Sequence, residues 1–126
     1  MASTMEDRPT GGRLSAAISN AVVRITADYT GRGPTKAQTS IRENMIVVLM
    51  QDTLTKSERT LLAADQGDFV LETRRRHQST MSIDLIAAVE LLTERKVSAF
   101  MSANHIEPDM GAEIFVLVPQ NGALEH

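Results

Sequence analysis

The stretch AQTSIRENMIVVLM, residues 37–50, decides the fold. Apolar and polar side chains alternate in residues 37–42, and residues 45–50 form an apolar run rich in β-branched residues, so both segments favour strands. Glu43 and Asn44 between them are typical of a tight turn, because Asn tolerates positive φ. The stretch therefore predicts a β-hairpin.

An amphipathic helix is predicted before this hairpin. Apolar residues recur at three- and four-residue intervals from Leu14 to Tyr29 and lie on one stripe of a helix. Gly31 or Gly33 is expected to end the helix, since glycine adopts the left-handed conformation and Pro34 cannot continue a helix.

A short helix is predicted after the hairpin. Thr55 and Glu58 have the spacing of a capping box, in which each side chain accepts a hydrogen bond from the backbone amide of the other residue. The helix is expected to run to about Ala64 and to stop around Gly67.

A long helix and a second hairpin complete the predicted elements. Residues 68–96 form the longest helical segment, and Arg95 and Lys96 in its last turn suit the negative end of a helix dipole. Strand-like stretches follow at residues 97–103 and 113–118, and the loop between them contains Asn, Pro, Asp and Gly.

The order helix, hairpin, two helices, hairpin predicts an α+β fold. We expect a single domain with a mostly antiparallel four-stranded sheet built from two β-hairpins, packed with one N-terminal helix, one short helix and one long central helix. Residues 1–12 are expected to be a flexible tail, residues 13–119 the domain and residues 120–126 a C-terminal tail. Leu124 to His126 resemble the start of a purification tag.

Composition excludes several classes of protein. The chain has 126 residues and no Cys, which removes disulfides, thiolate metal sites and thiol nucleophiles. The net charge is −3, a poor match for nucleic acid. The longest apolar run, residues 45–50, is too short to span a membrane, and the N-terminus lacks the apolar segment of a secretory signal. We expect a cytoplasmic protein with no nucleic-acid partner and no direct membrane insertion.

The glycine-rich segment 30–36 is the first candidate site. Its amides together with Arg32, Gly33, Thr35 and Lys36 could surround a phosphate or carboxylate. The order of residues is not that of a Walker loop. The alternative, which we favour, is a helix C-cap followed by a proline-fixed turn into a strand.

The second candidate is the basic run at residues 74–77. Successive helical side chains point about 100° apart, so these four spread around the helix axis instead of forming one patch. We favour a solvated face whose charges pair with Glu72 and its neighbours. An acidic partner surface is the alternative.

The third candidate is His105, Glu107 and Asp109. In an extended loop these three side chains would point the same way, and an imidazole with two carboxylates can bind a divalent cation or relay a proton. The alternative is an ordinary hairpin connection, for which Asn, Pro and Asp are typical residues.

Neither an enzyme nor a cofactor is predicted. The chain offers no cysteine, no nucleophile elbow and no phosphate-binding fingerprint. The strand at residues 45–50 is apolar on both faces, and such a strand is covered on both sides by helices or by another chain. If the helices lie on one face, the other face needs a partner, so we expect a homodimer with the sheet or the long helix at its interface.

Five blocks of the sequence together resemble a known bacterial family. They are Ser19-Asn20-Ala21-Val22-Val23, Tyr29-Thr30-Gly31-Arg32-Gly33-Pro34-Thr35-Lys36-Ala37, Asp52-Thr53-Leu54-Thr55-Lys56, Glu72-Thr73-Arg74-Arg75 and Asn104-His105-Ile106-Glu107-Pro108-Asp109. The family was once filed as a domain of unknown function and is now named after component C of a sodium-translocating, membrane-potential-generating system (MpsC-like). The similarity runs from about residue 14 to residue 119.

The resemblance implies a role beside a membrane cation-transport system but assigns no catalytic residue. One hypothesis is therefore a non-enzymatic accessory or regulatory protein that docks, through a transport-system partner, on the inner face of the membrane. The alternative is a cytoplasmic domain that binds a small anion or an acidic partner through the turn at residues 30–36.

Overall fold

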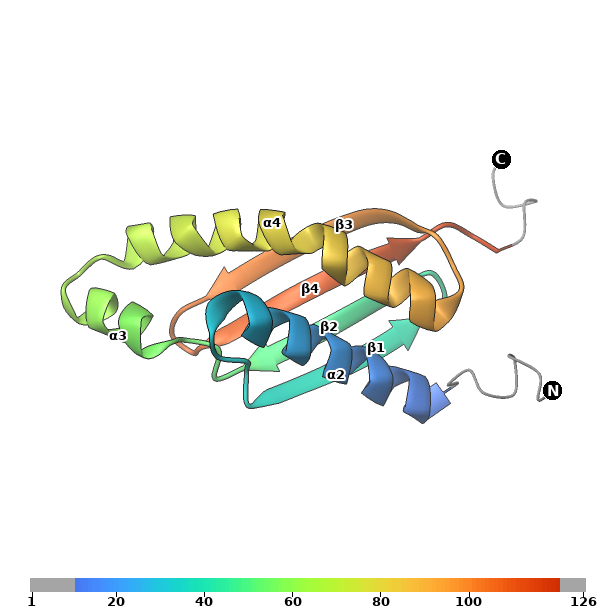
Figure 1. Cartoon of the computed structure of the whole chain (residues 1–126), viewed down its shortest axis with the longest axis horizontal. Helices are drawn as coiled ribbons and strands as arrows, with labels where there is room; N and C mark the ends of the chain where they lie inside the picture. Colours follow the sequence, from blue (N-terminus) through green and yellow to red (C-terminus); the bar gives the residue numbers. More distant parts are fainter. Residues whose placement is uncertain (1–10, 121–126) are drawn as a thin grey trace.

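The structure, a computed structural model, describes residues 11–120. The described chain forms seven elements, which follow one another as helix, hairpin, two helices, hairpin (Figure 1). They are α2 (Gly11–Thr30), β1 (Lys36–Arg42), β2 (Met45–Gln51), α3 (Lys56–Ala63), α4 (Gly67–Thr93), β3 (Val97–His105) and β4 (Met110–Leu117). The α+β fold predicted from the sequence is thus confirmed. Of the tails expected at residues 1–12 and 120–126, residues 1–10 and 121–126 lie outside the described residues.

The four strands form one antiparallel sheet in the order β1-β2-β4-β3. Each predicted hairpin is present, and the two hairpins join through β2 and β4, where Val47 pairs with Ile114. α2 and α4 lie side by side across one face of the sheet, and α3 packs against α4 at one end (Figure 1).

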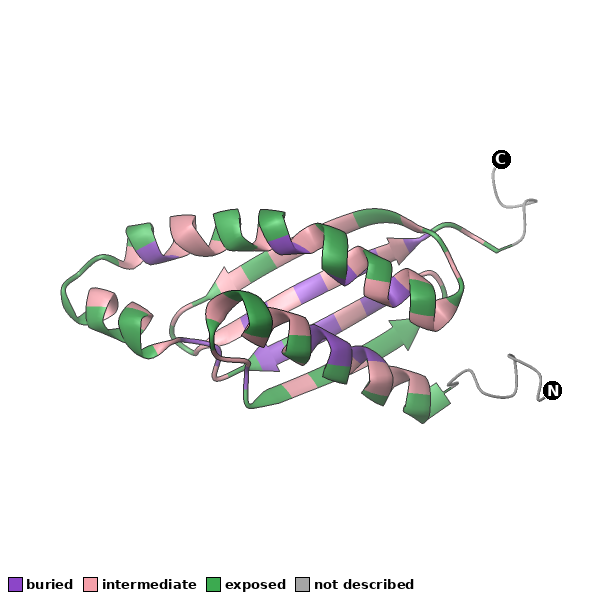
Figure 2. Ribbon diagram, in the orientation of Figure 1, coloured by how far each residue is buried: buried purple, intermediate pink, exposed green. Residues whose placement is uncertain are grey.

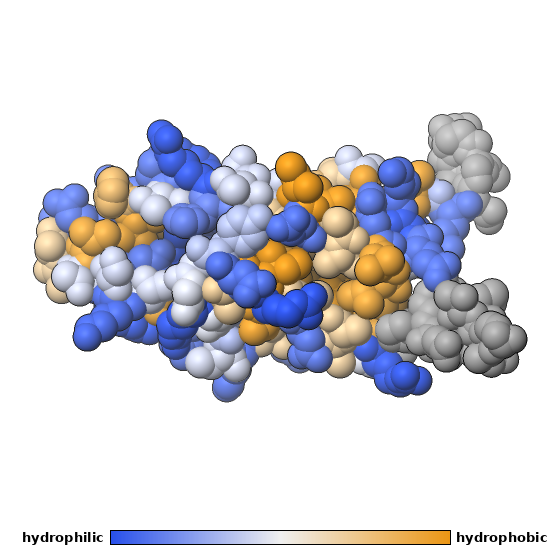
Figure 3. All heavy atoms as spheres, in the orientation of Figure 1, coloured by the Kyte–Doolittle hydropathy of each residue, from blue (hydrophilic) through white to orange (hydrophobic). Residues whose placement is uncertain are grey.

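The core lies between the two long helices and the sheet. The buried residues of β2 and β4 lie beneath α2 and α4 (Figure 2). Hydrophobic residues also reach the surface between α2 and α4 (Figure 3). The largest fully buried side chain is Phe115, whose ring lies 5.1 Å from that of Phe100. From the helices the core takes Ile18, Val22, Met81, Leu85 and Val89.

Local signals fix most element ends. Gly31 has φ +85 and its amide donates to the carbonyl of Ala27 at 2.8 Å, so of the two predicted candidates, Gly31 and Gly33, it is Gly31 that ends α2. The capping box of Thr55 and Glu58 starts α3, also as predicted. α2 begins at Gly11, two residues before the expected start of the domain.

Two further predicted boundaries were wrong. Gly67 begins α4 instead of ending α3, because Asp65, with φ 63, makes the reversal. α4 ends at Thr93, where Glu94 takes the left-handed conformation, so Arg95 and Lys96 lie beyond the helix.

The first hairpin turn also differs in detail. Glu43, not Asn44, has the positive φ. The side chain of Asn44 instead accepts a hydrogen bond from Arg95 at 2.6 Å, which ties the turn to the segment after α4.

Candidate functional site

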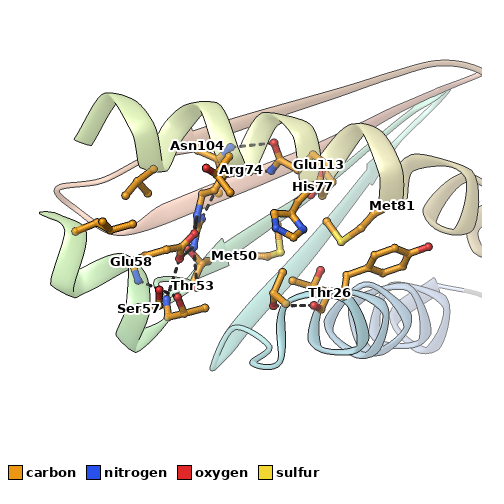
Figure 4. A pocket seen from close by; sticks show the side chains of 18 of the residues that line it. Thr26, Met50, Thr53, Ser57, Glu58, Arg74, His77, Met81, Asn104 and Glu113 are labelled. Carbon is orange, nitrogen blue, oxygen red and sulfur yellow. Dashed lines mark hydrogen bonds and ion pairs between the residues drawn. The ribbon is translucent and has the colours of Figure 1, made fainter. Parts of the chain in front are cut away.

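A cavity of about 360 Å³ lies between the helix layer and the sheet, near α3 (Figure 4). α2, α3, α4, β2, β3 and β4 all contribute to its lining. Four apolar side chains from β2, α3 and α4 line much of it: Met50, Leu61, Val70 and Met81. Its ionisable side chains are Tyr29, Glu58, Arg74, His77 and Glu113.

Arg74 lies at the centre of a hydrogen-bond network at one end of the cavity. Its Nε and Nη2 donate to the two carboxylate oxygens of Glu58 at 2.8 and 2.7 Å. Its Nη1 donates to Thr53 Oγ1 at 2.8 Å and to Asn104 Oδ1 at 3.2 Å, and Nη2 also donates to the Thr53 carbonyl at 2.8 Å. All five N–H groups of the guanidinium therefore have acceptors within the chain.

The partner of Arg74, Glu58, is held in its ionised form. Burial alone would raise the pKa of Glu58, but hydrogen bonds from Arg74 and from the Thr55 amide outweigh burial and lower it. The two side chains are 14% and 17% exposed, so the ion pair is largely shielded from water. The network thus joins α3, α4, β3 and the segment before α3, and its role is to hold these elements together.

The position of Arg74 was missed from the sequence, although a signal was present. Arg74 precedes Gln78 and Met81 by four and seven residues, the spacing of one helix face. Met81 is buried in the core, so this face of the long helix points inward. Gln78 exchanges hydrogen bonds with Asn104 at 3.2 and 2.9 Å.

The rest of the basic run agrees with the solvated face that we favoured. Arg75 and Arg76 are exposed and both pair with Glu72. The four side chains do spread around the helix, since Arg74 and His77 line the cavity whereas the other two do not.

Glu113 is the second carboxyl group at the cavity, and its pKa is raised, whereas that of Glu58 is lowered. It is 1% exposed and lines the cavity from β4, on the covered face of the sheet. Burial raises the pKa of Glu113 to about 7, and a hydrogen bond with Ser102 on β3 opposes this rise only in part. The sequence signal was its place two residues before Phe115 in a predicted strand, which puts both side chains on the same face.

The turn at residues 30–36 already holds a carboxylate of the chain itself. Arg32 donates to the carboxylate and the carbonyl of Asp52 at 3.0 and 2.6 Å, and Thr35 donates to the same carboxylate at 3.0 Å. These contacts, from Thr35 first and then Arg32, lower the pKa of Asp52. Lys36 is exposed at the start of β1 and lines a separate hollow. An external anion would therefore compete with Asp52 for two of the four candidate residues.

Gly33 is needed at this turn for close packing. A Cβ at Gly33 would lie 3.1 Å from both the carbonyl oxygen and Cγ1 of Val23 in α2. Pro34, the next residue, is buried. The turn thus packs closely against α2 just before the chain enters β1.

The three metal candidates do not come together. Asp109 accepts hydrogen bonds from Thr53 Oγ1 at 2.7 Å and from the Leu54 amide at 3.0 Å, whereas His105 Nδ1 contacts the Pro108 carbonyl at 2.8 Å. Among residues 11–120, no group of three or more His, Cys, Asp or Glu could hold a metal ion. The expected alternation fails because His105 ends β3 and the chain then turns.

The fold and the cavity define a single-domain α+β protein with helices over one face of an antiparallel sheet. A family model described as Na+-translocating membrane potential-generating system (MpsC) matches residues 10–118. The chain therefore belongs to the MpsC family, as the sequence blocks predicted. No curated protein and no solved structure matches the chain. None of the helices within residues 11–120 is long and apolar enough to cross a membrane.

Proposed function

We propose that the chain is a non-enzymatic accessory protein of a cation-translocating membrane system and works as a homodimer joined through the uncovered face of its sheet. Family membership supports the association with a sodium-translocating, membrane-potential-generating system. The observation that carries the dimer is the apolar character of that uncovered face.

The uncovered face is formed by every second residue of the four strands. Its central positions on β2, β3 and β4 are all apolar: Met45, Val47, Leu49, Ala99, Met101, Ala103, Ala112, Ile114 and Val116. Met45, Leu49 and Met101 are 45%, 39% and 49% exposed. The charged residues of the face, Lys36 and Arg42, lie on the edge strand β1. An apolar patch rimmed by polar residues is typical of a protein interface.

The size and charge of the face fit a second copy of the same chain. Four strands about 4.8 Å apart and about 25 Å long give a footprint of roughly 480 Å². Two such faces packed together bury on the order of 1,000 Å² or more, the lower bound for a specific interface. A central patch without charges is complementary to itself, which a two-fold symmetric interface requires.

Matched variants test which surface joins the copies. We expect Met101→Lys to convert the dimer to a monomer in analytical ultracentrifugation, because it buries a charge at the centre of the interface. Ile83→Lys on the outer side of α4 is the control, since Ile83 is 76% exposed and lies away from the sheet. If Ile83→Lys dissociates the dimer and Met101→Lys does not, the interface is α4 and the proposal is wrong.

Cell fractionation tests the accessory role. The chain is expected to sediment with membranes from host cells that contain the cation-translocating system and to stay in the supernatant when that system is deleted. Sedimentation with membranes that does not depend on the system would contradict a partner-mediated role, and so would a supernatant location in both strains.

A further inference from the structure

The cavity beside Arg74 has the size and lining of a binding site for a small molecule. Its volume of about 360 Å³ falls in the range of ligand pockets, roughly 300–1,000 Å³. Apolar side chains such as Val70 and Met81 form much of its wall, as is usual in such pockets.

The charges of the lining decide what kind of ligand fits. Arg74 has no N–H left to offer an anion, because Glu58, Thr53 and Asn104 accept all five. Glu58 is in turn occupied by Arg74 and the Thr55 amide. The hydroxyl of Tyr29 donates to Asp84, and His77 is exposed. The remaining ionisable group of the cavity is the carboxyl of Glu113, which accepts a hydrogen bond from Ser102.

A second, independent feature lies on the opposite wall. The hydroxyl of Thr26 on α2 is buried and has no hydrogen-bond partner among the described residues, although it lines the cavity. A buried polar atom without a partner destabilises the fold, and a hydrogen bond to a ligand would remove that cost. In Figure 4, Thr26 lies across the cavity from His77 and Met81, which project from α4.

Two partly exposed aromatic side chains are among the residues that line the cavity. Tyr29 and Phe69 are 37% and 56% exposed. The face of an aromatic ring attracts a cation, and recognition of organic ammonium groups uses this attraction. Two aromatic rings in the lining and a buried carboxyl group are thus both suited to an organic ammonium ligand.

We propose that this cavity binds a small organic ammonium, with its charged nitrogen at Glu113 and its apolar body between α2 and α4. This site is separate from the uncovered sheet face, so it does not depend on the proposed dimer.

Three probes of nearly equal size test the charge preference in isothermal titration calorimetry at pH 8. Benzylamine is protonated at this pH, benzyl alcohol is neutral and benzoate is an anion. We expect benzylamine to bind at least tenfold more tightly than either of the others. Equal binding of all three, tighter binding of benzoate or no binding at millimolar concentration would overturn the proposal.

Variants then locate the site. Glu113→Gln keeps the shape of the side chain and is expected to weaken benzylamine binding at least tenfold, whereas Glu107→Gln, at an exposed carboxylate outside the cavity, should leave it unchanged. Thr73→Phe, which fills the cavity from α4, should abolish benzylamine binding. This second variant tests the site even if Glu113→Gln does not fold. Undiminished binding in the folded Glu113→Gln or Thr73→Phe protein would place the amine elsewhere and contradict the proposal.

Discussion

The two faces of the sheet carry side chains from the same four strands, but helices cover only one of them. On the covered face, Phe115 and Ile46 are fully buried under α2 and α4. On the other face, Met45 and Met101 are about half exposed although they are just as apolar. Apolar character alone therefore does not tell which face of a sheet forms the core of a single chain.

The covered face also contains the chain's one fully buried acid among the described residues. Glu113 alternates with Phe115 on β4, so the face that should be most apolar carries a carboxyl group, and the uncovered face at its centre carries none. Apolar side chains turned to solvent and an acid turned to the core both cost stability. We infer that each is kept for binding, the first of a second copy and the second of a ligand.

Truncation of one apolar side chain on each face gives the largest expected contrast. Phe115→Ala should lower the free energy of unfolding by about 3–5 kcal/mol, because it leaves a cavity in the core. Met101→Ala should cost less than about 1 kcal/mol in dilute monomer, since its side chain already meets water. Urea titrations at low protein concentration measure both. Equal costs would show that the two faces are covered alike.

Removal of the buried acid should change how stability depends on pH. The pKa of Glu113 is raised to about 7 in the folded chain from 4.5, so the folded state binds a proton that the unfolded state has released. The contribution of Glu113 to the free energy of unfolding is thus fully present below about pH 4.5. It is lost as pH rises through 7, which lowers the stability by on the order of 3 kcal/mol.

Glu113→Gln should abolish that fall. The other ionisable groups at the cavity, Glu58, Arg74, His77 and Tyr29, remain in the variant and serve as its internal control. Urea titrations between pH 4.5 and 8.5 give the comparison. If wild type and variant follow the same pH profile, Glu113 does not titrate as described.

The Arg74 network sharpens the comparison, because it binds the covered face to α3 and has no counterpart on the uncovered face. Arg74→Met keeps the length of the side chain but leaves Glu58 without its ion-pair partner, so we expect a loss of about 2–4 kcal/mol. Arg75→Met, whose partner Glu72 is exposed, should cost less than about 1 kcal/mol. Thermal melts that show the two variants equally stable would refute this role for Arg74.

Local rules in the sequence predicted much of the fold. The apolar run of β2, the capping box of α3 and the Gly31 stop of α2 depend on neighbours within a few residues, and the structure confirms each of them. The end of α4 was misplaced because nothing in the adjacent sequence shows that Glu94 takes a left-handed conformation.

The site was harder to predict than the fold. Arg74 finds its acceptors at Thr53, Glu58 and Asn104, which are 16 to 30 residues away, and such contacts follow from the tertiary fold alone. The turn at residues 30–36 was placed correctly in the chain, but the carboxylate that it holds comes from Asp52 at the end of β2.

The smallest expected effect is at this turn, which ties α2 of the covering layer to the sheet. Gly33→Ala should cost about 1–2 kcal/mol because its Cβ would press on the backbone of α2. Arg32→Ala should cost less than about 1 kcal/mol, since the Arg32 and Asp52 side chains are 36% and 41% exposed and water screens their attraction. Thermal melts with and without phosphate check both variants. A rise in stability with phosphate that Arg32→Ala abolishes would favour an anion site instead.

The mass of the wild-type chain in solution tests the account most directly. The account predicts that light scattering at high micromolar concentration gives twice the mass of one chain, and that dilution lowers it toward a single chain. A mass that stays at one chain throughout this range would contradict the proposal that the uncovered sheet face joins two copies.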